Sequence, residues 1–258
     1  MIDISFSNYM VFFLVLIRIS GMILFHPIYS RKNIPTMVQA GLILAISVIL
    51  FYSLSDQTVV IRGVVEFVYT ALKEFAIGWI YGFILQLFMS VIMIGGEVMD
   101  MQMGLGMAKV YDPSSNVQMA LSSSFLNIMF YLIFFLSNSH LTTIRMVILS
   151  YDIVPVGVQT IHLEIGYFIT QLFSSILALS AKIALPVIAI EIISEACVGV
   201  LMKAIPQINV FVINIQIKVL VGILVLLLLV GPLSSFLQLV IDRSFATMGE
   251  AIRVLAYG

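Results

Sequence analysis

Long, nearly charge-free apolar runs leave this 258-residue chain few possible folds. The runs at 37–54 and 75–96 hold no charged residue, and each has close to the about 20 residues that an α-helix needs to cross the hydrocarbon core of a bilayer. The runs are too long for the strands of a membrane barrel and lack their alternation. We therefore predict an all-α chain with about six long apolar helices, several of them broken. The other expected helical runs are 9–28, 119–136, 165–190, 209–230 and, after a break at Gly231-Pro232, 233–248.

The composition excludes most classes of soluble protein. Apolar residues make up 62% of the chain and charged residues only 10%, whereas an average soluble domain is about 45–50% apolar and about 25% charged. A soluble domain of this size cannot bury so much apolar surface, and both intrinsic disorder and nucleic-acid binding require more charge. The chain is therefore expected in lipid or inside a large apolar assembly.

The segment at 95–113 has the most unusual local composition. It opens with Gly95-Gly96, where we predict a helix break, and continues through Gly104, Gly106 and four methionines to a turn at Asp112-Pro113. Glycine permits sharp turns, and irregular backbone at membrane depth persists only where protein buries it or where it lines a cavity. We predict a pore-lining or gating element here, in which the flexible side chains of Met103 and Met107 could seal around a variable object. The alternative is a re-entrant turn packed within a helix bundle.

Glu97 and Asp100 are the two carboxylates of this segment. They are three residues apart and hence neighbours on a helix face. A metal pair or a proton relay fits this spacing, as do carboxylates that cap helix ends or lie near Lys109 or a partner's basic residue. No second acidic motif, P-loop, GxSxG or CxxC sequence accompanies them. We therefore predict no enzyme activity, no catalytic residue, no metal and no cofactor.

Besides Lys203, five charged residues interrupt apolar helices and are candidate subunit-interface or polar helix sites. Such charges require partners, and because one six-helix chain offers few pairings, we expect some partners in other subunits. A small-residue motif, Gly78 followed by Gly82, also permits close helix contact. The five charged residues are Arg18, Lys182, Glu191, Glu195 and Lys218.

Several short motifs occur along the length of this sequence in a distinctive order and spacing. They are Arg18-Ile19-Ser20-Gly21 with Pro27, Ile34-Pro35, Gly96-Glu97 through Gln102-Met103-Gly104 to Asp112-Pro113, Asn138-Ser139-His140, Ser150-Tyr151, Pro155-Val156-Gly157, Ala184-Leu185-Pro186-Val187, and Ile205-Pro206-Gln207-Ile208-Asn209-Val210-Phe211 followed by Lys218. Together these motifs resemble those of the FliR/SctT family, membrane proteins of the flagellar and virulence type III export gate. Gln216 and Met107 are departures from the usual family pattern.

The resemblance implies membrane-associated helical hairpins built to join a helical hetero-oligomer. Residues 1–180 would be a FliP-like part with a plug loop at about 104–120, and residues 181–258 a FliQ-like hairpin. The implied partners are FliP and FliQ subunits, FlhB and FlhA, unfolded export substrates and membrane lipid. The implied location is the bacterial inner membrane at the flagellar basal body.

The resemblance also implies functional residues. Pro206 and Gln207 would lie at the turn of the FliQ-like hairpin, near where FlhB is expected to wrap. The channel plug would be a glycine-hinged loop that closes the resting channel. Its residues are Gly104, Gly106, Met107, Val110, Tyr111, Asp112 and Pro113.

The sequence thus favours a core subunit of the flagellar type III export gate, and three alternatives stay open. One is the corresponding subunit of a virulence type III secretion system. Another is a small-molecule membrane transporter, although no inverted repeat is visible. The last is an intramembrane enzyme that would use Glu97, Asp100 and His140.

Overall fold

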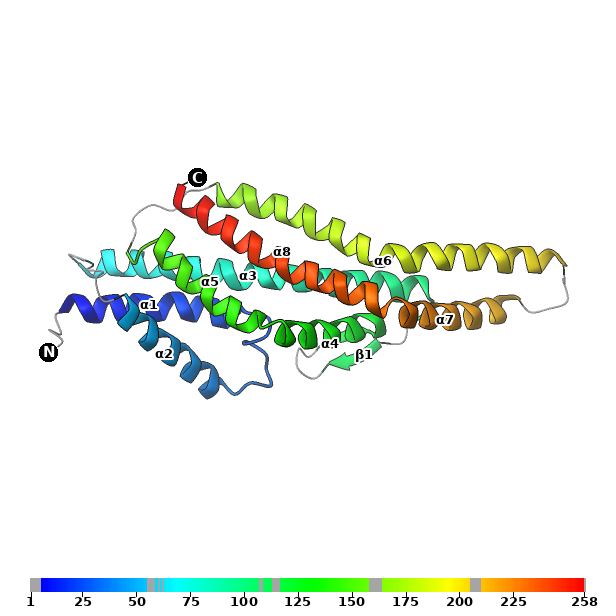
Figure 1. Cartoon of the computed structure of the whole chain (residues 1–258), viewed down its shortest axis with the longest axis horizontal. Coiled ribbons are helices and arrows are strands. Elements are labelled where there is room, and N and C mark those ends of the chain that lie inside the picture. Colours follow the sequence, from blue (N-terminus) through cyan, green and yellow to red (C-terminus); the bar gives the residue numbers. More distant parts are fainter. Residues whose placement is uncertain are drawn as a thin grey trace. The chain divides into compact units, whose positions relative to one another are not determined.

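The computed structural model confirms the prediction of an all-α chain, with one short β-ribbon in addition (Figure 1). It describes residues 6–54, 59, 61, 63–106, 109–112, 117–157, 164–204 and 210–257. Its elements are α1 (Phe6–Phe25), α2 (Thr36–Ser53), α3 (Val64–Gln102), β1 (Lys109–Asp112), β2 (Val117–Ala120), α4 (Leu121–Leu136), α5 (Ser139–Ile153), α6 (Ile165–Ala204), α7 (Val210–Leu228) and α8 (Val230–Tyr257).

The expected number of apolar helices is confirmed. Within the described residues, α1, α2, α3 and α6 are each long and apolar enough to cross a membrane. The pairs α4–α5 and α7–α8 pass the same test as bent units, with bends of 67° and 65°, which raises the number of possible spans to six. At the first bend, Asn138 has φ 57°, a left-handed conformation that ends one helix and that asparagine tolerates.

The predicted helix break at Gly95-Gly96 is wrong. Helix α3 continues through both glycines for 39 residues, about 58 Å at the rise of an α-helix. A Cβ on Gly96 would lie 2.6 Å from the Cα of Ser123 in α4. This glycine is therefore needed for close helix packing and not for a hinge. Helix α6 likewise continues through Pro186.

The predicted loop at 104–120 contains a β-ribbon that the sequence analysis did not predict. Strands β1 and β2 pair antiparallel, with Val110 opposite Met119 and Asp112 opposite Val117. Figure 1 shows the ribbon in the stretch that joins the end of α3 to the start of α4.

The chain forms two compact units. The first comprises Met1–Leu87, Asn138–Leu172 and Asp242–Gly258, and the second comprises Phe88–Ser137 and Phe173–Ile241. The helices α3, α6 and α8 each contribute residues to both. The expected division into a FliP-like part (1–180) and a FliQ-like hairpin (181–258) is a different division from these two units, and it stays a prediction.

In the first unit, the core is built around the contact of α1 with α3. A Cβ on Gly78 would overlap the carbonyl group of Arg18, and one on Gly82 would lie 2.8 Å from the carbonyl carbon of Phe25. The close contact that the Gly78–Gly82 motif predicts is thus confirmed. Leu14 and Ile19 of α1 are completely buried beside it.

In the second unit, the core is built around the last turns of α3. The side chain of Ser123 in α4 donates a hydrogen bond to the Met93 carbonyl at 2.9 Å. A Cβ on Gly95 would lie 3.2 Å from the Ser180 carbonyl of α6. This end of α3 is therefore in close contact with both α4 and α6.

Candidate functional site

The carboxylate of Asp100 binds the beginning of helix α4. It accepts hydrogen bonds from the Ser122 backbone N–H at 3.2 Å and from the Ser122 hydroxyl, and it is 1% exposed. The residue before α4, Ala120, has no side chain that could cap the helix. A carboxylate at a helix N-terminus satisfies free N–H groups and is favoured by the helix dipole. Of the roles that the sequence left open for Asp100, the structure supports the cap.

A cavity of about 300 Å³ adjoins this cap, in the second unit. Glu97 at its wall is exposed, whereas both oxygens of Asp100 are engaged by Ser122. The described residues contain no group of three metal-ligating side chains that could hold a metal ion. The cavity is lined by Glu97, Asp100, Met101, Leu105, Gly106 and Ala120.

The predicted plug begins at the wall of the same cavity. Gly104 has φ 76°, a conformation that residues with a Cβ rarely adopt, so this position requires glycine. Gly106 is exposed, and a Cβ there would meet no atom within 4 Å. Val110, Tyr111 and Asp112 lie on β1. Met107 and Pro113 lie outside the described residues.

Met103 was expected in a pore-lining or gating element, but the structure places it in a packed core. Its side chain is completely buried, at 0% exposure. A Cβ on Gly222 of α7 would collide with the Met103 thioether, so the two residues are packed directly together. Met103 therefore fills the core of the second unit and does not line an open channel.

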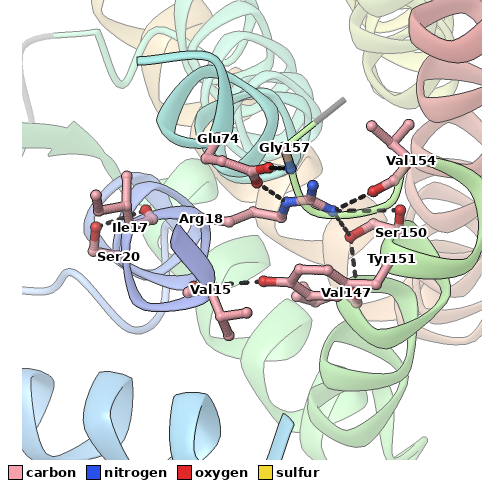
Figure 2. A network of polar contacts seen from close by, with 10 residues as sticks. All are labelled: Val15, Ile17, Arg18, Ser20, Glu74, Val147, Ser150, Tyr151, Val154 and Gly157. Atoms are coloured by element: carbon pink, nitrogen blue, oxygen red, sulfur yellow. Dashed lines mark hydrogen bonds and ion pairs between the residues drawn. The ribbon is translucent and has the colours of Figure 1, made fainter. Parts of the chain in front are cut away.

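Arg18 is the centre of a buried polar network in the first unit, shown in Figure 2. Its Nε donates to Glu74 Oε2 of α3 at 2.5 Å, and the two side chains are only 1% and 2% exposed. Its Nη1 donates to the Val154 carbonyl at 3.0 Å and to the Ser150 hydroxyl at 3.2 Å. The guanidinium carbon lies 4.1 Å from the centre of the Tyr151 ring. One arginine thus joins α1, α3 and α5.

Glu74 and Gly157 complete this network, and the sequence analysis did not identify either as a functional residue. The second oxygen of Glu74 accepts the Gly157 N–H at 2.9 Å. Figure 2 shows that one oxygen of Glu74 accepts a hydrogen bond from Arg18 and the other from Gly157. Glu74 could have been identified from the sequence, because it directly precedes the charge-free run at 75–96. A carboxylate that is buried at such a position requires a cation as its partner.

The other charged helix residues differ in their surroundings. Lys218 Nζ binds Glu195 Oε2 at 3.2 Å, Lys182 is exposed, and Glu191 is completely buried at 0% exposure. Arg18, Glu195 and Lys218 therefore each have an ion-pair partner within this chain. Pro206 and Gln207 lie outside the described residues.

His26 stabilises the turn that follows α1. Its Nδ1 accepts the N–H groups of Ile28 and Tyr29 at 3.1 and 3.3 Å, and the ring is completely buried. Burial lowers the pKa of His26 to about 3, so the ring is neutral at physiological pH. Burial also raises the pKa of the Tyr29 phenol, whose hydroxyl donates to the His140 carbonyl at 3.4 Å.

Comparisons with known proteins give a consistent result. A family model described as "Bacterial export proteins, family 1" matches residues 9–244. The flagellar biosynthetic protein FliR of Bacillus subtilis (strain 168) is 25% identical over 95% of this chain and 95% of its own length. FliR of Aquifex aeolicus (strain VF5) is 30% identical over 82% of this chain and 81% of its own. The surface presentation of antigens protein SpaR of Shigella flexneri is 30% identical over 64% of each chain.

Proposed function

This chain belongs to the bacterial export proteins, family 1, and we propose that it is a core subunit of the flagellar type III protein export gate. In this role it forms and plugs the channel through which unfolded flagellar substrates cross the inner membrane. The observation that carries the proposal is the similarity to flagellar biosynthetic proteins over 95% of the chain. The role is structural and gating, without catalysis or a cofactor.

The proposed assembly contains FliP and FliQ subunits and is contacted by FlhB and FlhA. Residues 1–180 take the FliP-like place and residues 181–258 the FliQ-like place, with Pro206 and Gln207 at the turn near FlhB. Apolar side chains left at the surface support an assembly of this kind. Leu220, Leu224 and Leu227 of α7 are 66%, 51% and 68% exposed, and their spacing places them on one face of the helix.

The proposed plug is the segment from Gly104 to Ala120. At rest, the β1–β2 ribbon with Val110 and Tyr111 occludes the channel, and an exported chain displaces it. Two observations support this assignment. Gly104 follows the end of α3 in a left-handed conformation, and Asp100 ties the beginning of α4 to the end of α3. The segments on either side of the ribbon are thus held in place, and the proposal assigns the displacement to the ribbon between them.

Removal of residues 106–116 tests the plug. The matched control replaces 106–116 by a glycine–serine linker of equal length, which retains the span but removes the side chains. We expect both variants to assemble and to make the membrane permeable to ions or small molecules, measured as dye release from vesicles that contain the purified complex. Vesicles that stay sealed with both assembled variants would refute the plug, and a failure of both to assemble would mean that the segment is a packing element.

The virulence system remains the second candidate, because the chain also resembles SpaR of Shigella flexneri. Gene disruption in the source organism distinguishes the two. Loss of flagella with intact virulence secretion supports the flagellar gate, and the reverse result supports the alternative. The mass of the complex purified in mild detergent also tests the alternative of a small-molecule transporter. A small homo-oligomer that takes up a substrate would contradict an export gate.

A further inference from the structure

The carboxylate of Glu191 is buried without a hydrogen bond. The residue lies in the middle of α6 and is 0% exposed. Neither Oε1 nor Oε2 has a hydrogen-bond partner among the residues that the structure describes. An ionised carboxylate in such surroundings loses its hydration without replacement, which is far more costly than burial of the neutral acid.

Glu191 lies beside a glycine of the neighbouring helix α7. It faces Gly222 of α7, where an added Cβ would lie 3.1 Å from Glu191 Oε1 and would also collide with the Met103 side chain. The charged groups that act on Glu191 within the described residues are Lys218 of α7 and Glu195, one turn further along α6. Met103, from the end of α3, contributes only a thioether to this site.

The charges of this cluster do not balance if every group is ionised. Among the described residues, Lys218 is its one cation, and the Lys218 Nζ lies 3.2 Å from Glu195 Oε2. Glu195 is about half exposed, with 53% of its side chain accessible, so it keeps water as well as the lysine. The carboxylate that water cannot reach, Glu191, is therefore the one left without compensation.

We propose that Glu191 is a proton-binding site, occupied at neutral pH, which releases its proton when Lys218 moves to it from Glu195. The movement of Lys218 admits water to the site, the acid O–H bond breaks, the proton passes to that water, and the resulting carboxylate is compensated by the lysine ammonium. A metal ion does not fit the same place, since no group of three suitable ligands exists in the described part of the chain. Release of the proton exchanges one ion pair for another across a single turn of α6.

This exchange affects the base of the proposed plug. Glu191 and Met103 both pack on Gly222, and Met103 directly precedes Gly104, where the chain leaves α3. A charge on Glu191 and the approach of Lys218 would alter this contact. The link to gating rests on the proposed function, whereas the proton site does not.

Infrared difference spectroscopy of the intact purified complex tests the site directly. A protonated carboxylic acid has a carbonyl stretch that ionised carboxylates lack. We expect this band at neutral pH in the wild type and its loss in Glu191→Gln. We expect the band to persist in Lys218→Gln, the control that removes the compensating cation, and to weaken in Glu195→Gln, which frees Lys218 to compensate Glu191. Identical spectra for the wild type and Glu191→Gln would overturn the proposal.

A second variant covers the case in which Glu191→Gln does not assemble. Glu191→Asp retains the acid on a shorter side chain, so the band should persist at a shifted frequency, and an unshifted band would overturn the assignment. The spectrum reports only on the protonation of this residue. Its outcome is therefore independent of the dye-release experiment, which decides whether the chain plugs a channel.

Discussion

Replacement of Arg18 by methionine should destabilise this chain more than any other single change to its charged residues. Methionine preserves much of the length and apolar stem of arginine but removes the guanidinium. Glu74, 2% exposed, would lose its ion-pair partner, and the acceptors at Val154 and Ser150 would lose their donors. Loss of one member of a buried ion pair typically costs about 3–5 kcal/mol. An effect of about 3 kcal/mol changes the ratio of folded to unfolded chain by more than about 100-fold.

The assay is the thermal unfolding of the purified complex for Arg18→Met, Glu74→Gln and the double variant. Glutamine at position 74 can still accept the Gly157 N–H, which Glu74 accepts at 2.9 Å. Most of the cost of Arg18→Met comes from the stranded Glu74 charge, so the double variant should be more stable than Arg18→Met alone. If the two effects simply add, the residues do not interact, and the assignment of the network as the link between α1, α3 and α5 is wrong.

Three further predictions concern packing, capping and pH. Gly78→Leu should cost about 3 kcal/mol or more, because its side chain would meet the Arg18 backbone, whereas Gly63→Leu, with no atom near its Cβ position, should have little effect on the melting temperature. Asp100→Ala should cost about 0.5–2 kcal/mol by loss of the cap on α4, measurable as faster hydrogen exchange at Ser122. Because the pKa of His26 is about 3 in the fold and about 6.5 when unfolded, its contribution to stability is complete above about pH 6.5 and falls with decreasing pH. That loss is about 2 kcal/mol at pH 5, and unfolding of His26→Asn should lack this dependence on pH; an equal dependence would refute the burial of a neutral ring.

The number of apolar helices could be predicted from the sequence, but not the continuity of each one. The mean hydropathy of a segment depends only on the residues in that segment, so it identifies an apolar helix whatever that helix packs against in the fold. A glycine pair has two opposite uses: it can end a helix, or it can let another helix come close. Gly95-Gly96 has the second use, and only the position of Ser123, far along the chain, decides this. The β1–β2 ribbon was missed for a related reason, since strands of 4 residues are too short to show periodicity.

The candidate site could be predicted in part, because the sequence reveals which residues are costly to bury but not which of them meet. Arg18 stands out as a charge in an apolar run, yet its partner Glu74 is 56 residues away. Asp100 and Glu97 look equivalent in sequence, and the structure separates them: Asp100 is buried against α4, and Glu97 is exposed. Spacing on one helix therefore predicts which residues share a face, but not which face is covered.

The distribution of charge and apolar surface changes the expected basis of assembly. The sequence led us to expect partners in other subunits for some of the lone charges, and Arg18 and Lys218 are paired within the chain. The surfaces left open are apolar instead. In the described part of α2 only Ile46, Ser47 and Leu50 are buried, while Met37 is 85% exposed. Contacts between exposed ions contribute little in water, whereas burial of apolar surface contributes about 25 cal/mol per Å². In the proposed gate, neighbouring subunits would therefore be held mainly by apolar helix faces, and the internal ion pairs would keep each subunit in the shape that presents those faces.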